Sequence, residues 1–258
     1  WSFNSGSEAF DYLDDSESLT LTYVVTVTDD SGVTDTQDVV ITINGTNDAP
    51  VISIASGDSA DDTLTETDAG LTATDTLTVV DVDLSDDIDA IVSSVVASDV
   101  TSGLGSNNAA LAAMLTVTAG TIDADTGDTN NITWSFNSGS EAFDYLADGE
   151  DLTLTYVVTV TDDNGVADTQ NVVITIQGSN DAPTIVSAST DSAGDVTEIT
   201  DGAAGEGSAN LTDTGTVTFD DIDVTDTHIA TVHAVVKDGV GDTIASPDVN
   251  ASIYSDCR

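Results

Sequence analysis

An internal repeat is the sequence feature that most restricts how this chain can fold. Residues 1–50 and 134–183 are identical at 42 of 50 positions without a gap, an offset of 133 residues. A looser match joins residues 71–87 to 211–227 at an offset of 140. Self-similarity at a fixed period indicates a repeat architecture, and 133 residues is an ordinary domain size. We therefore expect the end of one repeat (1–46), a complete repeat (47–179) and the start of a third repeat (180–258).

The charge of the chain excludes several classes of function. It has 48 Asp and Glu residues against 2 Lys and Arg residues, a formal net charge of −46. Such a chain repels phosphate backbones and anionic lipid surfaces, so we expect no nucleic-acid partner and no membrane insertion. Hydrophobic residues still reach 39%, in short clusters of Val, Ile and Leu, which predicts a folded protein rather than a disordered acidic tail.

The first residue and the single cysteine of the chain also restrict what it can be. The chain begins at Trp1 and not at an initiator methionine, so we expect it to be a fragment of a longer protein. Cys257 is the only cysteine and cannot form an internal disulfide. Bound metal ions are therefore the candidate for additional stabilisation of the fold.

Period-two patterns predict a β-rich fold. Apolar residues alternate with threonine or valine from Leu152 to Val160, and the alternation resumes from Val172 to Ile176 after an Asp-Asn-Gly sequence. This pattern predicts a β-hairpin with a short acidic turn. About seven short strands in one repeat predict an all-β, immunoglobulin-like β-sandwich. The further expected elements are strands at 49–54, 76–80, 88–96, 114–122 and 132–136 and one Ala-rich helix at 107–115.

The rare glutamates recur at matching places in the repeats. Six of the seven form pairs, namely Glu8 with Glu141, Glu17 with Glu150, and Glu66 with Glu198. If only charge mattered, aspartate would be expected to replace them freely. We infer that these positions require the longer carboxylate.

Two Asp-x-Asp triplets follow predicted strands. Asp81 and Asp83 come directly after residues 76–80, and Asp221 and Asp223 occupy the matching place in the third repeat. Alternate residues of an extended segment point the same way, so each triplet presents two carboxylates to one point. Oxygen ligands without a Cys or His cluster suit Ca²⁺ and argue against zinc or copper. Further oxygen donors are Asn47, Asp48, Asn180 and Asp181 at the repeat boundaries and Asp162 and Asp163 in the hairpin turn.

The ordered motifs resemble a known family. VTVTDDNG followed by VVITIQGSNDAP is similar to the end of a cadherin-type repeat, and closer still to the bacterial cadherin-like VCBS repeats. In those, Asp-x-Asp after a strand, Gly-Glu before LTLTY, VTVTDD and NDAP follow in this order. The resemblance covers the complete middle repeat and both partial ones. It implies tandem cadherin-like β-sandwiches in a large secreted, type I-exported adhesin at the bacterial cell surface.

The resemblance also implies where calcium binds. In cadherin-type chains, calcium lies between consecutive domains and is held from both sides and by the linker. Gly45 and Gly178 stand where cadherin linkers carry aspartate, which implies one or two ions per junction rather than three. The implied ligands are Asp15, Glu17, Asn47, Asp48, Asp81, Asp83, Asp162 and Asp163 at the first junction, and Glu66, Asp148, Glu150, Asn180, Asp181, Asp221 and Asp223 at the second.

These observations predict a structural protein and not an enzyme. Without metal, clustered carboxylates repel and an array of repeats flexes, whereas Ca²⁺ neutralises them and fixes adjacent repeats. We expect a calcium-rigidified extender repeat that spaces an adhesive tip from the cell in attachment or biofilm formation. Its partners would be neighbouring repeats of the same chain, with a host or bacterial surface reached through other domains.

Other interpretations stay open at this point. A direct carbohydrate- or cell-surface-binding module would use residues 97–131, which the partial repeats do not duplicate. The Asp-Thr-Gly triplets at 125–127 and 213–215 are similar to aspartic protease loops, yet they lie in different parts of their repeats and cannot be symmetry mates. General acidity of a halophile's protein does not explain the repeated glutamates.

The remaining distinctive side chains have simpler expected roles. His228 and His233 are expected at the surface. Core packing is the default expectation for the aromatic residues shared by the repeats, with an exposed sugar-binding platform as the alternative. These aromatic residues are Trp134, Phe136, Phe143, Tyr145 and Tyr156, which recur in the first copy as Trp1, Phe3, Phe10, Tyr12 and Tyr23.

Overall fold

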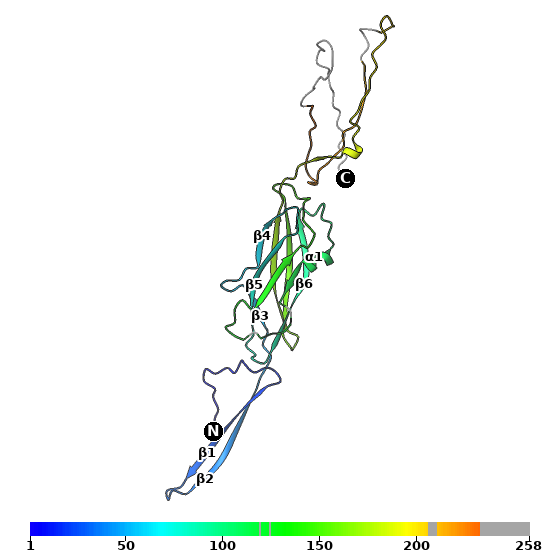
Figure 1. Cartoon of the computed structure of the whole chain (residues 1–258). Coiled ribbons are helices and arrows are strands. Elements are labelled where there is room, and N and C mark those ends of the chain that lie inside the picture. The colour runs from blue at the N-terminus through cyan, green and yellow to red at the C-terminus, as the bar shows by residue number, and fades with distance from the viewer. Residues whose placement is uncertain (119, 124, 206–210, 233–258) are drawn as a thin grey trace. The chain divides into compact units, whose positions relative to one another are not determined.

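The computed structural model describes residues 1–118, 120–123, 125–205 and 211–232 (Figure 1). The chain divides into two compact units. One comprises Trp1–Phe143 with Asp151–Gln177, and the other comprises Asp144–Glu150 with Gly178–Arg258. The three repeats expected from the sequence stay a prediction. Among the described residues, no helix has both the length and the apolar character of a membrane span.

The first unit contains a β-sandwich of two sheets. The strand pairs are antiparallel except for the parallel pair β4 and β11. This arrangement confirms the all-β sandwich expected from the period-two patterns. The five-stranded sheet has the order β4 (Asp61–Thr65), β11 (Ala167–Gln177), β10 (Asp151–Thr161), β6 (Asp87–Asp99), β8 (Ile122–Asp123). The four-stranded sheet has the order β3 (Val51–Ser53), β5 (Thr72–Val80), β9 (Ile132–Asn137), β7 (Leu115–Val117).

The core lies between the two sheets. Alternate residues of β10, from Leu152 to Val160, are fully buried, and the intervening threonines and valine are only partly buried. The rings of Phe136 on β9 and Tyr156 on β10 meet edge to face with centroids 6.4 Å apart, which joins the two sheets. The shared aromatic residues of the complete repeat are all buried, so their expected core role is confirmed. The expectation is wrong for the first copy, where Trp1, Phe3, Tyr12 and Tyr23 are exposed.

The repeated hairpin has the same register in both copies. β1 (Ser18–Thr28) pairs with β2 (Thr34–Asn44) so that Tyr23 faces Val39, and β10 pairs with β11 so that Tyr156 faces Val172. The alternating sequence and the Asp-x-x-Gly turn therefore fix the register locally. Burial differs, because Tyr23 is 49% exposed and Tyr156 is 0% exposed. Only the second copy has strands β4 and β6 on its edges.

Three local expectations have different outcomes. The expected Ala-rich helix is present as α1 (Asn108–Met114), and the Asn107 side chain caps it by accepting from the amides of residues 109 and 110. The single strand expected at 114–122 is wrong, because β7 and β8 lie in different sheets and Gly120 between them has φ +92°. β4 was not expected, because it is short and begins with Asp61 and Asp62, a residue type that is depleted in strands.

The second unit has less regular structure in its described part. β12 (Thr184–Ile185) pairs with β13 (Phe219–Asp220), and a 3₁₀ turn, η1, covers Ser187–Ser189. β13 leads directly into Asp221 and Asp223, as β5 leads into Asp81 and Asp83.

The buried hydroxyl of Tyr156 offers a test of the sandwich. It donates to the carbonyl oxygen of Leu111 at 3.0 Å and thereby joins β10 to α1. We expect Tyr156→Phe to lower the free energy of unfolding by about 1–2 kcal/mol, because a buried carbonyl loses its partner. Urea unfolding followed by the fluorescence of the buried Trp134 measures this change. The matched Tyr23→Phe, at a half-exposed ring, is expected to change it by less than about 0.5 kcal/mol; equal effects of the two would contradict the interpretation.

Candidate metal centre

A tight loop after β5 carries three buried aspartates. The amide of Asp83 donates to Asp81 Oδ1 at 3.1 Å, and the amide of Asp86 donates to the carbonyl oxygen of Asp83 at 3.2 Å. These bonds fold the loop so that Asp81 and Asp83 are 2% exposed and Asp86 is 7% exposed. Desolvation of three carboxylates within six residues makes this loop costly without a neutralising partner.

The β10–β11 turn adds a fourth carboxylate. Asp162 Oδ1 accepts the amide of Val166 at 2.7 Å, and the amide of Gly165 donates to the Asp162 carbonyl oxygen at 3.1 Å. The other carboxylate oxygen, Oδ2, accepts from the Asn47 side chain at 3.2 Å. Asp162 is therefore both the first residue of the turn and part of the acidic site.

The fifth carboxylate, Asp14, comes from a loop far away in sequence. Its Oδ1 accepts from Asn164 Nδ2 at 2.5 Å and its Oδ2 accepts from Ser16 Oγ at 3.2 Å. Asn164 also donates to Asn47 Oδ1. The start of the linker passes so close that a Cβ on Gly45 would lie 2.2 Å from the Asp14 carbonyl oxygen. This contact explains why position 45 requires a residue without a side chain.

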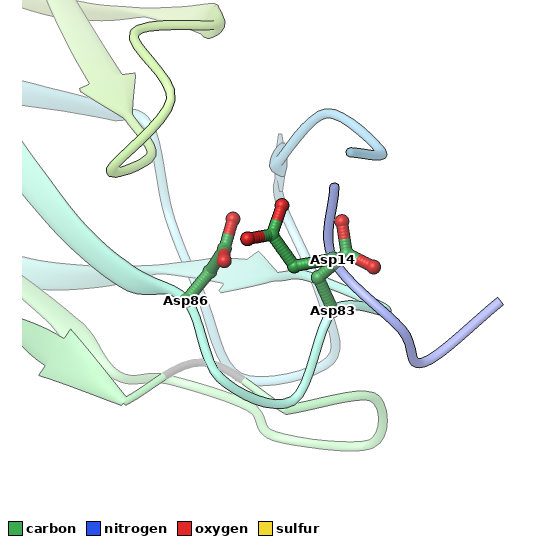
Figure 2. A group of neighbouring side chains, drawn as sticks. All are labelled: Asp14, Asp83 and Asp86. Carbon is green, nitrogen blue, oxygen red and sulfur yellow. The ribbon is translucent and has the colours of Figure 1, made fainter. Parts of the chain in front are cut away.

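We call Asp14, Asp81, Asp83, Asp86 and Asp162 the first acidic cluster. Carboxylate oxygens of Asp14, Asp83 and Asp86 all lie within 4.8 Å of one another, and so do those of Asp81, Asp86 and Asp162. Figure 2 shows the first of these groups, with Asp14 on a separate segment from the loop that carries Asp83 and Asp86. Asp86 belongs to both groups, so the cluster offers two adjacent positions for a cation.

Several oxygens of the cluster have no partner within the described structure. They are Asp81 Oδ2, Asp83 Oδ1 and Asp86 Oδ2. A buried polar atom without a hydrogen bond is costly, and a buried carboxylate oxygen is more so. The chain has only two basic residues, Lys237 and Arg258, and both lie outside the described residues. The donor set thus fits a cation supplied from solution.

The electrostatics of the cluster agree with this fit. Burial, followed by repulsion from the other cluster members, raises the pKa of Asp86 to about 6. Burial and neighbouring carboxylates also raise the pKa of Asp81 and of Asp83. For Asp14, burial acts to raise the pKa, but hydrogen bonds from the backbone and from Asn164 outweigh it and lower the pKa. The carboxylates therefore repel one another strongly when all are charged.

The structure brings together part of the ligand set expected at the first junction. Asp81, Asp83 and Asp162 belong to the cluster, Asn47 contacts it, and the amide of Asp48 donates to Asp83 Oδ2 at 2.6 Å. Asp15 and Asp163 are exposed. Glu17 Oε2 accepts the amide of Asp14 at 3.3 Å, so it supports the loop that carries Asp14.

Two members of the cluster, Asp14 and Asp86, were missed from the sequence. Asp86 could have been found, because the spacing of Asp81, Asp83 and Asp86 recurs as Asp221, Asp223 and Asp226. Asp14 could not be found by comparing repeats, because its counterpart is Ala147.

The second acidic loop, residues 221–226, repeats the local geometry. The amide of Asp223 donates to Asp221 Oδ1 at 3.2 Å, and the amide of Asp181 donates to Asp223 Oδ2 at 2.7 Å. Asp223 is 2% exposed and its Oδ1 has no partner among the described residues. Burial, then repulsion by neighbouring carboxylates, raises the pKa of Asp223.

The other residues expected as ligands at the second junction are either exposed or hydrogen-bonded to residues outside the second acidic loop. Asp148 and Asn180 are exposed, while Glu150 Oε2 accepts the amide of Ala147 at 3.1 Å. Glu66 is buried directly after β4, and its amide donates to the carbonyl oxygen of Gln177 at 2.8 Å. The glutamate pair 17 and 150 thus has a local reason for the longer side chain, because each carboxylate reaches back to an amide three residues earlier.

One histidine expectation is wrong and the other is outside the described residues. The His228 side chain is only 11% exposed, and its Nε2 lies 2.6 Å from Asp221 Oδ2. Its ring also contacts Phe219, with ring centroids 4.9 Å apart. Comparison of the repeats could not predict this contact, because the histidine replaces Ile88 of the complete repeat. His233 falls outside the described residues.

Comparisons with known proteins give no family for this chain, since no family model and no curated protein matches it. Solved structures similar to it include the CooA pilin subunit from enterotoxigenic Escherichia coli, at 14% identity over 52% of this chain and 100% of the pilin, TM-score 0.33. Drosophila N-cadherin EC1-4 matches at 16% identity over 69% of this chain and 37% of that one, TM-score 0.32. The protocadherin GammaB4 extracellular domain matches at 14% identity over 66% of this chain and 24% of that one, TM-score 0.34. These TM-scores are low, so the β-sandwich assignment rests on the strand pairing itself.

The raised pKa of Asp86 predicts an unusual pH dependence of the metal-free protein. Its folded pKa is about 6 against an ordinary value of 3.8, so between these values the folded state holds more protons than the unfolded state. Stability must then rise as the pH falls from 7 towards 4. We expect a higher Tm in EDTA at pH 5 than at pH 7. Asp86→Asn should weaken this dependence, and an equal slope in both proteins would contradict the assignment.

Proposed function

We propose that the first acidic cluster binds Ca²⁺, and that the chain is a calcium-rigidified structural repeat of an extracellular adhesin. The observation that carries this proposal is the burial of five carboxylates, three of which keep an oxygen without a hydrogen-bond partner, in a described part of the chain that contains no Lys or Arg. An external cation is the simplest neutralising partner for such a site. Asp81, Asp83, Asp86, Asp162 and Asp14 would hold it.

The ligand chemistry favours calcium over other metals. Ca²⁺ takes six to eight oxygen ligands in flexible geometry, and the cluster supplies carboxylates with Asn47 beside them. Zinc and copper prefer histidine and cysteine, and neither residue is in the cluster. Mg²⁺ retains several waters and rarely occupies an all-protein cage, which makes it the weaker candidate.

An ion in this cluster would connect segments that are distant in sequence. It would touch the loop after β5, the β10–β11 turn and the loop containing Asp14, with the linker at Asn47 and Asp48 beside them. In the repeat organisation that we propose, with boundaries at 46/47 and 179/180, Asp14 belongs to the preceding repeat. The ion would then fix one repeat to the next, as the resemblance to VCBS repeats implies.

Rigid junctions give a chain of repeats a mechanical role. Such a chain would hold an adhesive domain away from the bacterial surface, in attachment or biofilm formation. The described residues contribute a scaffold to this role, with neighbouring repeats as the partners and no chemical step. The binding of a target surface would belong to other domains.

Variants of the cluster test the calcium proposal. We expect millimolar Ca²⁺ to raise the Tm of the wild-type chain by about 10 °C or more over EDTA, because an ion that binds only the folded state stabilises it by mass action. Asp83→Asn with Asp86→Asn should remove most of this increase. The same double variant should raise the Tm in EDTA, because it relieves repulsion, and this opposite change excludes simple misfolding.

A control and a competing ion complete this test. Asp89→Asn removes the same kind of charge from an exposed position on β6 and should leave the calcium effect intact. Sodium chloride at matched ionic strength distinguishes a specific site from a solvated acidic surface. If sodium stabilises the wild-type chain as much as calcium does, the proposed calcium function is wrong.

A further inference from the structure

We infer that Asp14 gives the first acidic cluster a cation position that the second acidic loop cannot form, because Ala147 stands in the matching place. The two linkers of this chain would then differ in the number of ions that they bind. This inference rests on the proposed calcium function and specifies how that function varies along the chain.

The loops that carry Asp14 and Ala147 share their backbone hydrogen bonds, although Gly149 has φ +84° and its counterpart Ser16 is not in the positive-φ region. The amide of Glu17 donates to the Asp14 carbonyl oxygen at 2.9 Å, and that of Glu150 donates to the Ala147 carbonyl oxygen at 3.0 Å. In each loop the glutamate carboxylate accepts the amide of the residue three positions earlier. The difference between the two loops at this position is therefore the side chain alone.

The linkers also approach these loops in the same way. Gly45 donates its amide to the Glu17 carbonyl oxygen at 3.0 Å, and Gly178 donates to that of Glu150 at 2.8 Å. A Cβ on either glycine would lie within 2.3 Å of backbone carbonyl oxygens in the loop. Because glycine has no side chain, each loop can lie directly against its linker. Asp14 and Ala147 consequently occupy equivalent positions beside the two linkers.

The acidic loops that complete the sites are also equivalent. The amide of Asp48 donates to Asp83 as the amide of Asp181 donates to Asp223. The amide of Asp226 donates to the Asp223 carbonyl oxygen at 3.1 Å, which matches the bond from Asp86 to Asp83. Both loops therefore present the same aspartates, although His228, in place of Ile88, lies 2.6 Å from Asp221 Oδ2 in the second loop. Only the first loop receives a carboxylate from the position of Asp14.

Unpartnered buried oxygens indicate that the position beside Asp14 is built for a ligand. Asp83 Oδ1 and Asp86 Oδ2 have no hydrogen-bond partner among the described residues, and both side chains are more than nine-tenths buried. Asp14 completes this group within 4.8 Å. The neighbouring group of Asp81, Asp86 and Asp162 does not include Asp14. Loss of Asp14 should therefore remove one cation position and retain the other.

Asn164 adds a positioning role to this arrangement. Its side chain donates to Asp14 Oδ1 at 2.5 Å and holds the carboxylate beside Asp83 and Asp86. The residue matching Asn164 in the first hairpin is Ser31, whose shorter side chain lacks the amide. Asp14 and Asn164 thus each differ from the matching residue in the other copy, which is Ala147 for Asp14 and Ser31 for Asn164.

Calcium titration of the full chain by isothermal calorimetry tests the inference. We expect Asp14→Ala to bind one Ca²⁺ fewer than the wild type, or to weaken one class of site by at least tenfold, and to retain the remaining sites. Asp14→Asn, which keeps the size of the side chain, should show the same loss. Asp11→Ala removes an equal charge from a nearby exposed position and should bind as the wild type does. Circular dichroism in EDTA confirms that each variant is folded.

The reverse substitution provides a second arm. Ala147→Asp should add a Ca²⁺ or tighten one class of site by at least tenfold, whereas no change would overturn the assignment of the difference to this position. If the wild type binds calcium and Asp14→Ala binds it identically, the inference is wrong and the calcium function stands. If the wild type binds no calcium, both are wrong.

Discussion

The main constraint on this structure is a group of carboxylates that it buries without a hydrogen-bond partner for every oxygen. Asp81, Asp83 and Asp86 are nearly inaccessible, and each keeps an oxygen without a hydrogen bond among the described residues. Buried charges of one sign raise their own pKa values and destabilise the folded state that brings them together. The chain has 2 Lys and Arg residues for 48 acidic ones, and the residues that the structure describes include neither of the two. The cation that we propose for this site would therefore couple ligand binding to folding.

Elementary strand geometry explains why these residues meet. The end of β5, the start of β6 and the β10–β11 turn lie at one end of the sandwich, because β10 pairs antiparallel with both β6 and β11. The aspartates at these positions are held by their own loops, since Asp162 closes its turn and Asp81 accepts an amide of its loop. Backbone amides of the loops thus hold the carboxylates of Asp81 and Asp162 in place. Only Asp14 reaches the site from a segment outside the sandwich strands.

The sequence predicts the features that depend on local pattern. Alternation in β10 and β11 gave the hairpin, and Asp81 and Asp83 were recognised because an Asp-x-Asp follows a strand. The features that depend on tertiary context were not predictable. β4 is a strand because its backbone pairs with β11, although its residues are mostly polar. The residues at 114–122 divide between two sheets because Gly120 permits a left-handed turn. Comparison of the repeats predicted Glu17 as a metal ligand, whereas its carboxylate supports a loop. It could not identify Asp14, because the matching residue in the second copy is different.

Identity between the repeats therefore reports the scaffold more than the ligands. The residues that the two copies share include the strand alternation, the turn glycines, the glutamate that supports its loop and the glycine at the linker, and each of these fixes the backbone. Two of the differences are Asp14 against Ala147 and Ser31 against Asn164. Asp14 of the first copy and Asn164 of the second are in contact, through a hydrogen bond from the Asn164 amide to Asp14 Oδ1. A constant backbone with variable loop side chains allows one fold to present sites of different charge. Differences among otherwise similar repeats are then the place to look for differences in ion binding along such a chain.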